Sequence, residues 1–239
     1  MLTETSAVEK DFDRLARLDD EGWAHNNHYH NLLLRHVPET CGCALDLGCG
    51  TGTFSRRLAA RANSVLALDL SSEMVRVAQS RSSQFSNIDF QVGDVMDCDF
   101  PVENFDCIAT IATLHHLPLP ELLAKLKVAL KPGGTLIILD LFEPERDLFK
   151  VEGWWDLLAH VAACAVSGTL RLWHNGRLKP PREVRAAWEE HGKTDSYLTM
   201  SKACDVYESL VPGAIVRRHL LWRYSVVWQK PATDRGAND

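Results

Sequence analysis

Short apolar or alternating runs are interspersed with longer amphipathic segments along most of the chain. Strands that are covered on both faces are apolar at nearly every position, so these runs are predicted to be buried parallel strands. They occupy 44–47, 64–70, 88–93, 105–113 and 135–141. Apolar residues at helical spacing follow in segments such as 53–62 and 121–130. This alternation predicts an α/β domain built on a parallel sheet.

The two ends of the chain follow different patterns. Residues 1–39 are mostly amphipathic and helical, and the second of their helical segments stops at Pro38. Near the other end, 214–221 and 223–229 have the pattern of two paired antiparallel strands separated by Trp222. We therefore expect one seven-stranded, mostly parallel sheet with a terminal antiparallel strand.

The strand at 44–47 ends in three glycines at alternate positions, Gly48, Gly50 and Gly52, and carries one acid, Asp46. Glycine adopts backbone angles closed to other residues and lets a ligand press against the main chain. A dinucleotide fingerprint needs its third glycine at the sixth position, which is Thr53 here. The pattern instead resembles the Asp/Glu-x-Gly-x-Gly-x-Gly motif of class I S-adenosylmethionine-dependent methyltransferases.

The resemblance covers residues 40–142 and includes the Leu-Lys-Pro-Gly-Gly turn that ends at Gly134. Within this family the chain resembles the type 11, ubiquinone-biosynthesis-like members, which act on small molecules. It implies a Rossmann-like sheet, S-adenosylmethionine as cofactor and S-adenosylhomocysteine as product. The expected divisions are an N-terminal helical cap (1–39), the cofactor-binding core (40–142), a helical substrate-covering insertion (143–201), a C-terminal helix and strand pair (202–231) and a disordered tail (232–239).

Asp69 ends the second predicted strand, 21 residues beyond Gly48. A carboxylate there can accept both ribose hydroxyls of an adenosine, although a strand-end acid can also cap the next helix. By resemblance, Met74 lies beside the adenine, Asp94 accepts the adenine amino group and Val95 packs on the ring. The full expected cofactor set is Asp46, Gly48, Cys49, Gly50, Gly52, Asp69, Leu70, Met74, Asp94, Val95 and Ile111.

Two adjacent histidines, His115 and His116, directly follow the fourth predicted strand. Ligands of parallel sheets bind beyond the carboxyl ends of the strands, and an imidazole can accept a proton near neutral pH. We expect His116 to be the catalytic base or to orient the substrate, with His115 second; one of the pair could instead only hold the loop. By resemblance, Tyr29 and His30 are expected to bind the substrate. No metal site is expected from the histidines at 25–30, because no carboxylate or cysteine lies nearby in sequence.

Tryptophans and basic residues gather between Phe142 and about Ser201. They are Trp154, Trp155, Trp173 and Trp188, with Arg171, Arg177, Lys179, Arg182 and Arg185. One interpretation is a helical cap with core tryptophans and solvated arginines. The other is an apolar cavity with one or two arginines for an anionic group.

The charge balance argues against nucleic acid as a partner. The net charge is −6, and no long basic run offsets it. Seven cysteines without paired metal spacing are expected to be free thiols in a reducing compartment. The chain begins without a signal-peptide pattern, and its most apolar longer stretch is too short to cross a bilayer. We therefore expect a cytoplasmic protein with no membrane partner, whose oligomeric state the sequence does not fix.

These patterns favour a methyltransferase that acts on an oxygen, nitrogen or carbon atom of a small molecule. Fold alone does not fix function, so two alternatives stay open. The first is a regulatory protein that binds S-adenosylmethionine without turnover. The second is an NAD-dependent oxidoreductase, which Thr53 at the sixth position of the glycine pattern disfavours.

Overall fold

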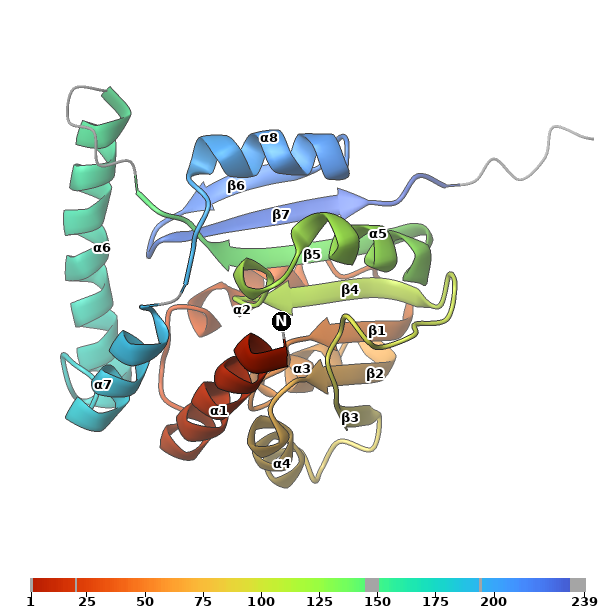
Figure 1. Cartoon of the computed structure of the whole chain (residues 1–239), viewed down its shortest axis with the longest axis horizontal. Coiled ribbons are helices and arrows are strands. Elements are labelled where there is room, and N and C mark those ends of the chain that lie inside the picture. Colours follow the sequence, from red (N-terminus) through yellow and green to blue (C-terminus); the bar gives the residue numbers. More distant parts are fainter. Residues whose placement is uncertain (1, 20, 145–150, 194, 233–239) are drawn as a thin grey trace, which may run out of the picture.

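The computed structural model describes residues 2–19, 21–144, 151–193 and 195–232 and shows one sheet with helices packed around it (Figure 1). The strands are β1 (Cys41–Leu47), β2 (Ala62–Asp69), β3 (Ile88–Val92), β4 (Phe105–Ile111), β5 (Leu130–Leu141), β6 (Ile215–His219) and β7 (Arg223–Gln229). The α-helices are α1 (Leu2–Leu18), α2 (His30–Leu34), α3 (Thr53–Leu58), α4 (Ser72–Arg81), α5 (Leu119–Ala129), α6 (Val151–Asn175), α7 (Arg182–His191) and α8 (Met200–Leu210). Two 3₁₀ turns are η1 (Asn27–Tyr29) and η2 (Leu114–His116).

The sheet has the predicted seven strands, in the order β3-β2-β1-β4-β5-β7-β6. The first five pair in parallel, and β7 runs antiparallel to both of its neighbours. The strand order reverses between β1 and β4, and in doubly wound sheets ligands bind in the crevice at such a reversal. The predicted fold class is therefore confirmed, and the topology places a site at the carboxyl ends of β1 and β4.

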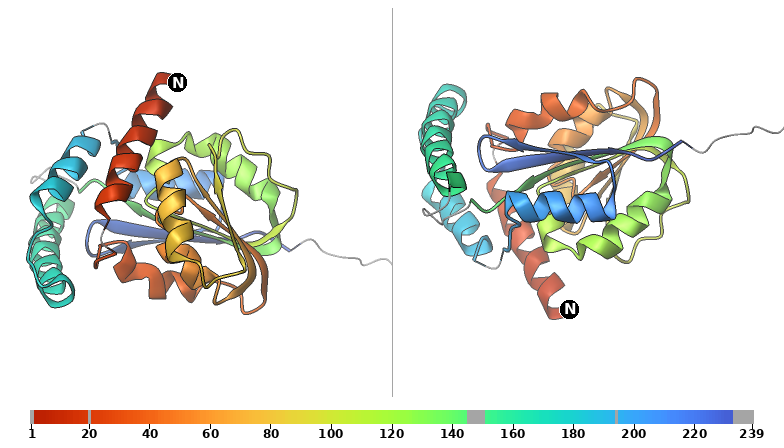
Figure 2. Two further views of the ribbon diagram at one scale, coloured as in Figure 1. Left: turned by 90° about the horizontal axis from the view of Figure 1, so that it is seen from below. Right: turned by 90° about the horizontal axis from the view of Figure 1, so that it is seen from above.

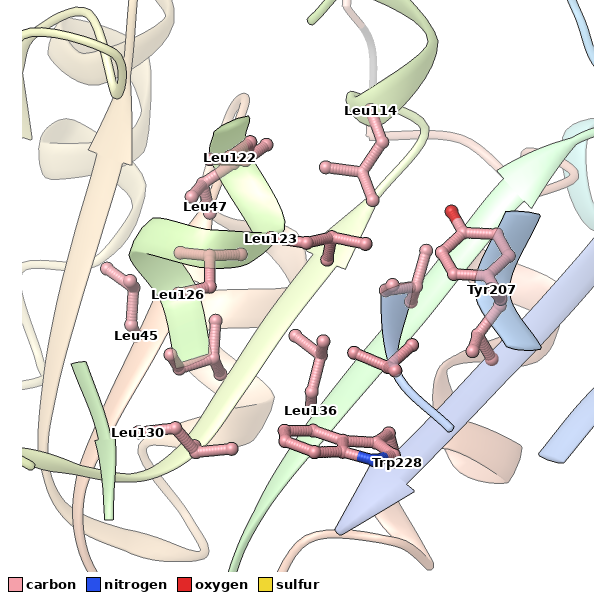
Figure 3. Close-up of a cluster of buried hydrophobic side chains, with 14 of the residues drawn as sticks. Leu45, Leu47, Leu114, Leu122, Leu123, Leu126, Leu130, Leu136, Tyr207 and Trp228 are labelled. Carbon is pink, nitrogen blue, oxygen red and sulfur yellow. The ribbon is translucent and has the colours of Figure 1, made fainter. Parts of the chain in front are cut away.

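Helices cover both faces of the sheet (Figure 2). One core contains leucines of β1 and α5 together with Tyr207 of α8, and Figure 3 shows them converging. A second core on the other face joins α2 and α3 to the sheet, with Leu58 at its centre. Burial on both faces accounts for the near-continuous apolar character of the central strands.

Strand β5 is longer than the sequence predicted. It begins at Leu130 instead of Thr135, and it contains the Lys-Pro-Gly-Gly segment that we interpreted as a turn. Phe105 of β4 pairs with Leu130, and the register then shifts before Cys107 pairs with Thr135. Proline and glycine in a strand interior are tolerated at such irregularities, so the local sequence signal for a turn was misleading here.

Helices α6 and α7 lie beside the carboxyl edge of the sheet, on the same side as α1 (Figure 1). Helix α6 has several exposed apolar side chains, including Trp154, Trp155 and Trp173. The expectation that these tryptophans form a core is therefore wrong. No helix among the described residues is long and apolar enough to cross a membrane. The tail predicted at 232–239 lies, beyond residue 232, outside the described residues.

We expect Leu123→Ala in α5 to lower the free energy of unfolding by about 2–5 kcal/mol, because truncating a buried leucine leaves a cavity. The Leu123 side chain is fully buried in the core of Figure 3. Val128 lies on the same helix with 52% of its surface exposed, so Val128→Ala is the matched control. Urea unfolding measures both; equal losses would contradict this account of the core.

Candidate active site

The glycine turn after β1 is held by backbone hydrogen bonds from the neighbouring strand. The N–H groups of Gly48 and Cys49 both donate to the carbonyl of Leu68 on β2, at 2.8 and 3.0 Å. Gly48, Gly50 and Gly52 have φ of +70°, +53° and +75°, a region that side chains other than glycine's rarely adopt. A Cβ on Gly48 would lie 2.1 Å from Thr113 Oγ1, whereas a Cβ on Gly50 would meet nothing within 4 Å. The turn therefore fits closely against the end of β4 and leaves open space above Gly50.

Asp69 connects this turn to the start of α4. Its two carboxylate oxygens accept hydrogen bonds from the N–H of Gly50 at 2.8 Å and from the N–H of Ser71 at 2.9 Å. Ser71 in turn caps α4 through its hydroxyl, which accepts from Met74 N at 3.1 Å. Burial raises the pKa of Asp69, and the backbone bonds oppose that shift. A carboxylate oxygen can accept more than one hydrogen bond, so Asp69 still has capacity for ribose hydroxyls.

Asp46 and Cys49 lie beneath the turn and not on its open side. Asp46 is almost completely buried and accepts from the Ser55 hydroxyl at 2.5 Å, which ties β1 to α3. Burial raises the pKa of Asp46 to about 7. The thiol of Cys49 is also buried, and its pKa is raised well above the ordinary value. Both residues support the turn from within.

The remaining residues expected at the cofactor lie around the turn. Leu70, Asp94 and Ile111 follow or end β2, β3 and β4, and Met74 lies in the first turn of α4. Asp94 Oδ1 accepts from the N–H of Met96 at 2.8 Å, which closes the loop after β3. Met74 and Val95 are mostly buried in apolar clusters, Met74 against α1. The structure thus brings these positions to one edge of the sheet, and their contacts to a cofactor stay predictions.

The N-terminal helix reaches over the glycine turn. Asp13 on α1 accepts from the Ser71 hydroxyl at 2.6 Å and from the backbone N–H of Glu73 at 3.3 Å. Just beyond α1, Asp19 accepts from the hydroxyl of Thr51 at 2.7 Å. The segment therefore connects to both the glycine turn and α4, and its role as a cap over the cofactor stays a prediction.

His115 is fixed by a buried carboxylate at the end of β5. Asp140 accepts from the ring Nδ1 of His115 at 2.7 Å and from its backbone N–H at 3.2 Å. Asp140 is 2% exposed. This bond places a proton on Nδ1 and leaves Nε2 of His115 as an acceptor. The sequence analysis missed Asp140, because an acid inside an apolar strand gives no local sign of its partner.

His116 points toward the segment that follows α7. Its Nδ1 lies 3.6 Å from Asp195 Oδ1, and its Nε2 is buried with no hydrogen-bond partner among the described residues. Phe12 of α1 and His191 of α7 pack on the ring, with centroids 5.7 and 5.1 Å away. Burial, and secondarily the neighbouring His115, lower the pKa of His116 to about 4. The pKa of His116 is therefore lower than the near-neutral value that the sequence analysis expected.

The side chains of His115, His116 and Asp195 are of the types that bind metal ions, and they lie close together. Their donor atoms lie within 4.8 Å of one another. Ligands of one tetrahedral zinc ion, each about 2.1 Å from it, lie about 3.4 Å apart. Two of the three groups are engaged elsewhere: His115 with Asp140, and Asp195 with the hydroxyl of Tyr197 at 2.6 Å. His116 Nδ1 lies 3.6 Å from Asp195 Oδ1, beyond hydrogen-bond range, so we interpret the cluster as a network of neighbouring polar side chains and not as a preformed metal centre.

A cavity of about 530 Å³ opens beside this network. Its walls combine apolar groups with polar ones from several elements, including Phe142, Trp222, His25, Tyr197 and Arg223. Trp222 lies in the tight turn between β6 and β7, with φ of +58°, a conformation that is uncommon for a bulky residue. Strained backbone is concentrated at functional sites, so the turn is consistent with a role in shaping the cavity.

Tyr29 and His30, expected to bind the substrate, do not line this cavity. The hydroxyl of Tyr29 donates to the carbonyl of Leu220. His30 is 3% exposed and packs on Phe54, with ring centroids 5.0 Å apart. Both residues help to attach the N-terminal segment to the core, and the nearby His25 takes the position at the cavity.

The arginines of the insertion do not form the apolar cavity with an anion-binding arginine that was one of our two interpretations. Arg182 and Arg185 are exposed, and Arg171 lies over the Trp23 ring, 5.7 Å from its centroid. Among the described residues, no arginine of the insertion is in the wall of the 530 Å³ cavity. The arginine found there is Arg223 of β7, which the sequence analysis did not single out.

The family model, the relatives and the solved structure reported below are all methyltransferases. The chain matches a protein family described as "Methyltransferase domain" over residues 44–134. An uncharacterized methyltransferase of Mycobacterium tuberculosis is 32% identical over 217 residues, which are 89% of this chain and 99% of that protein. A demethylmenaquinone methyltransferase of Tropheryma whipplei is 28% identical over 59% of this chain and 62% of its own length. The crystal structure of the N-methyltransferase NodS of Bradyrhizobium japonicum in complex with S-adenosylhomocysteine is similar in fold, with a TM-score of 0.56. The two sequences are 16% identical, and the superposition covers 94% of this chain and 98% of NodS.

We expect Asp69→Asn to weaken S-adenosylmethionine binding by about 1.5–3 kcal/mol, the usual contribution of a hydrogen bond to a charged group. The substitution keeps the size of the side chain and removes one acceptor oxygen beside the glycine turn. Asp97→Asn, at an exposed position after β3, is the control and should bind normally. Isothermal titration calorimetry measures both affinities. If the folded Asp69 variant binds like the wild type, Asp69 only connects the glycine turn to the start of α4.

Proposed function

Because the chain belongs to the class I S-adenosylmethionine-dependent methyltransferases, we propose that it transfers the methyl group of this cofactor to a small-molecule acceptor. The glycine turn suits the cofactor, since the space above Gly50 is open and Asp69 lies beside it. The quinone precursor named for the Tropheryma whipplei relative supports an acceptor of small-molecule size. The acidic net charge of −6 supports the absence of a nucleic acid substrate.

The observation that carries the proposal is the position of the His115–His116 network. It follows β4, and Thr113 of the same loop lies against Gly48 of the turn. An acceptor in the neighbouring cavity can therefore approach the cofactor side of the sheet past these two imidazoles.

The cofactor supplies a methyl group already activated by its sulfonium charge. The protein's residues then have three tasks: to align the acceptor, to exclude water and to accept the acceptor's proton. Phe12 and the helices at the carboxyl edge shield His116, whose side chain is 13% exposed. The lowered pKa of His116 keeps its imidazole neutral at physiological pH, and its buried Nε2, which has no hydrogen-bond partner among the described residues, is the nitrogen proposed to receive the proton. His115, held by Asp140, is the positioning residue of the pair.

Two measurements test the proposal at successive levels. Calorimetry with S-adenosylmethionine, S-adenosylhomocysteine and NAD should show binding of the first two compounds only. Mass spectrometry should then find a product 14 mass units heavier, the mass of one CH₂, when the protein acts on a panel of phenols, amines and carboxylic acids. Cofactor binding without any methylated product across the panel would favour the regulatory alternative. NAD binding alone would overturn the assignment.

We expect His116→Ala to lower the turnover of the best acceptor by about 10²-fold, the low end of general-base contributions, with cofactor affinity nearly unchanged. His115→Ala should lower it less. His36→Ala is the control, because His36 lies before β1, at the opposite edge of the sheet. Steady-state kinetics and calorimetry on the same preparations separate turnover from binding.

The pH profile provides a further readout of the same variant. A base must be neutral to accept a proton, so the wild-type rate should fall as pH drops through about 4, the lowered pKa of His116. The His116→Ala variant should lose this acidic limb. Normal turnover by His116→Ala, or an unchanged limb, would leave His116 as a residue that only holds the loop.

A further inference from the structure

Arg223 is a buried cation at the edge of the sheet, where β7 begins. It pairs with Leu141 across the β5–β7 ladder, so it lies at the carboxyl end of β5. Only 7% of its surface is exposed. Burial lowers the pKa of its guanidinium to about 10, which still leaves the group charged at physiological pH.

The hydrogen bonds of Arg223 leave one end of the guanidinium unused. Nε donates to Asn26 Oδ1 at 2.7 Å, and Nη1 donates to the carbonyls of Leu221 and Trp222 at 3.2 and 3.4 Å. Nη2 makes no hydrogen bond to the described residues, and it is not among the unpartnered atoms that are sealed from solvent. Its two N–H groups therefore face accessible space, and Arg223 is part of the wall of the 530 Å³ cavity.

No ion pair of Arg223 is present within the described part of the chain. Asp140, whose charge acts on Arg223, is hydrogen-bonded to His115. Asp195 and Glu143 line the same cavity, and Asp195 accepts from Tyr197. A buried charge without a counter-ion is costly, because desolvation is not compensated. Such a group in a ligand cavity indicates that the ligand brings the opposite charge.

The rest of the cavity wall narrows the class of ligand. Leu141, Phe142 and Trp222 offer apolar contact. His25 Nε2 shares a hydrogen bond with the Ser167 hydroxyl at 2.8 Å. Burial and the charge of Arg223 lower the pKa of His25 to about 3, so this side chain adds no second cation to the cavity. Arg223 offers one nitrogen without a hydrogen bond to the described residues, and the carboxylates of Glu143 and Asp195 also line the cavity, so a monoanion fits better than a doubly charged phosphate.

We propose that the methyl acceptor, or the product formed from it, is a small molecule with an apolar body and a carboxylate that binds Nη2 of Arg223. This inference rests on the proposed function, and it names the acceptor class for the same site. The carboxylate is the recognition group at the β5–β7 end of the cavity. The atom that receives the methyl group lies toward His115 and His116, on the side of β4.

Matched pairs of neutral and anionic probes test the proposal. Benzoate, 3-phenylpropanoate and hexanoate are compared with their amides by saturation-transfer NMR and competition titration, with and without S-adenosylhomocysteine. We expect at least one carboxylate to bind wild type about tenfold tighter than its amide, as a charged hydrogen bond predicts. Arg223→Gln should abolish the preference while the affinity for S-adenosylhomocysteine is retained. Arg182→Gln, which removes an exposed arginine outside the cavity, should keep it.

The outcomes separate this inference from the proposed function. If the wild type binds the carboxylate and the amide equally in all three pairs, the inference is overturned. This comparison uses the wild type alone, so it still applies if the Arg223→Gln protein does not fold. A preference that persists in a folded Arg223→Gln protein also overturns it. Parallel loss of S-adenosylhomocysteine affinity would assign Arg223 to the cofactor's own carboxylate instead. Wild type that binds no S-adenosylhomocysteine would contradict the proposed function, whatever the probe preference.

Discussion

The carboxylate of Asp69 is the constraint on which the cofactor side of the molecule depends. It accepts from the N–H of Gly50 and from the N–H of Ser71, so one buried group fixes the glycine turn and the first turn of α4 together. Because charged hydrogen bonds are strong in a desolvated site, this pair holds three left-handed glycines in place. Asp13 and Asp19 then attach the N-terminal segment to the same two elements. The position of α1, and of Phe12 against His116, follows from that attachment.

The acceptor side depends on a second buried carboxylate, Asp140, in a similar way. It fixes the ring of His115 from the adjacent strand, and its negative charge also acts on Arg223. Arg223 and the histidine pair thus differ in electrostatic character. Burial keeps the imidazole of His116 neutral at physiological pH, and the β7 end of the cavity carries a guanidinium with no ion pair in the described part of the chain.

The sequence predicted most of the fold, because strand burial, glycine turns and helix caps are local patterns. The turn at Gly48 is an example, and the β5 extension through Pro132 is an exception, since tertiary pairing overrode turn propensity there. The acceptor side was less predictable. Asp140, Asp195 and Arg223 come from distant elements, and the sequence does not reveal which side chains the fold brings together. Tyr29 and His30, expected by resemblance alone, lie outside the wall of the cavity because they pack against the core, and their contact with a substrate stays a prediction.

The place of Arg223 in the sheet also bears on how such a protein can diverge. Strand β7 lies between β5 and β6 in the sheet, so the position of its first residue is set by the fold itself. Helices α6 and α7 occupy the segment between β5 and α8 and lie beside the carboxyl edge without forming part of the sheet (Figure 1). A descendant could therefore replace these covering helices, and change the size of molecule it admits, while the guanidinium stays where it is. Selection on the range of acceptors and selection on their charge would then act on separate parts of the gene.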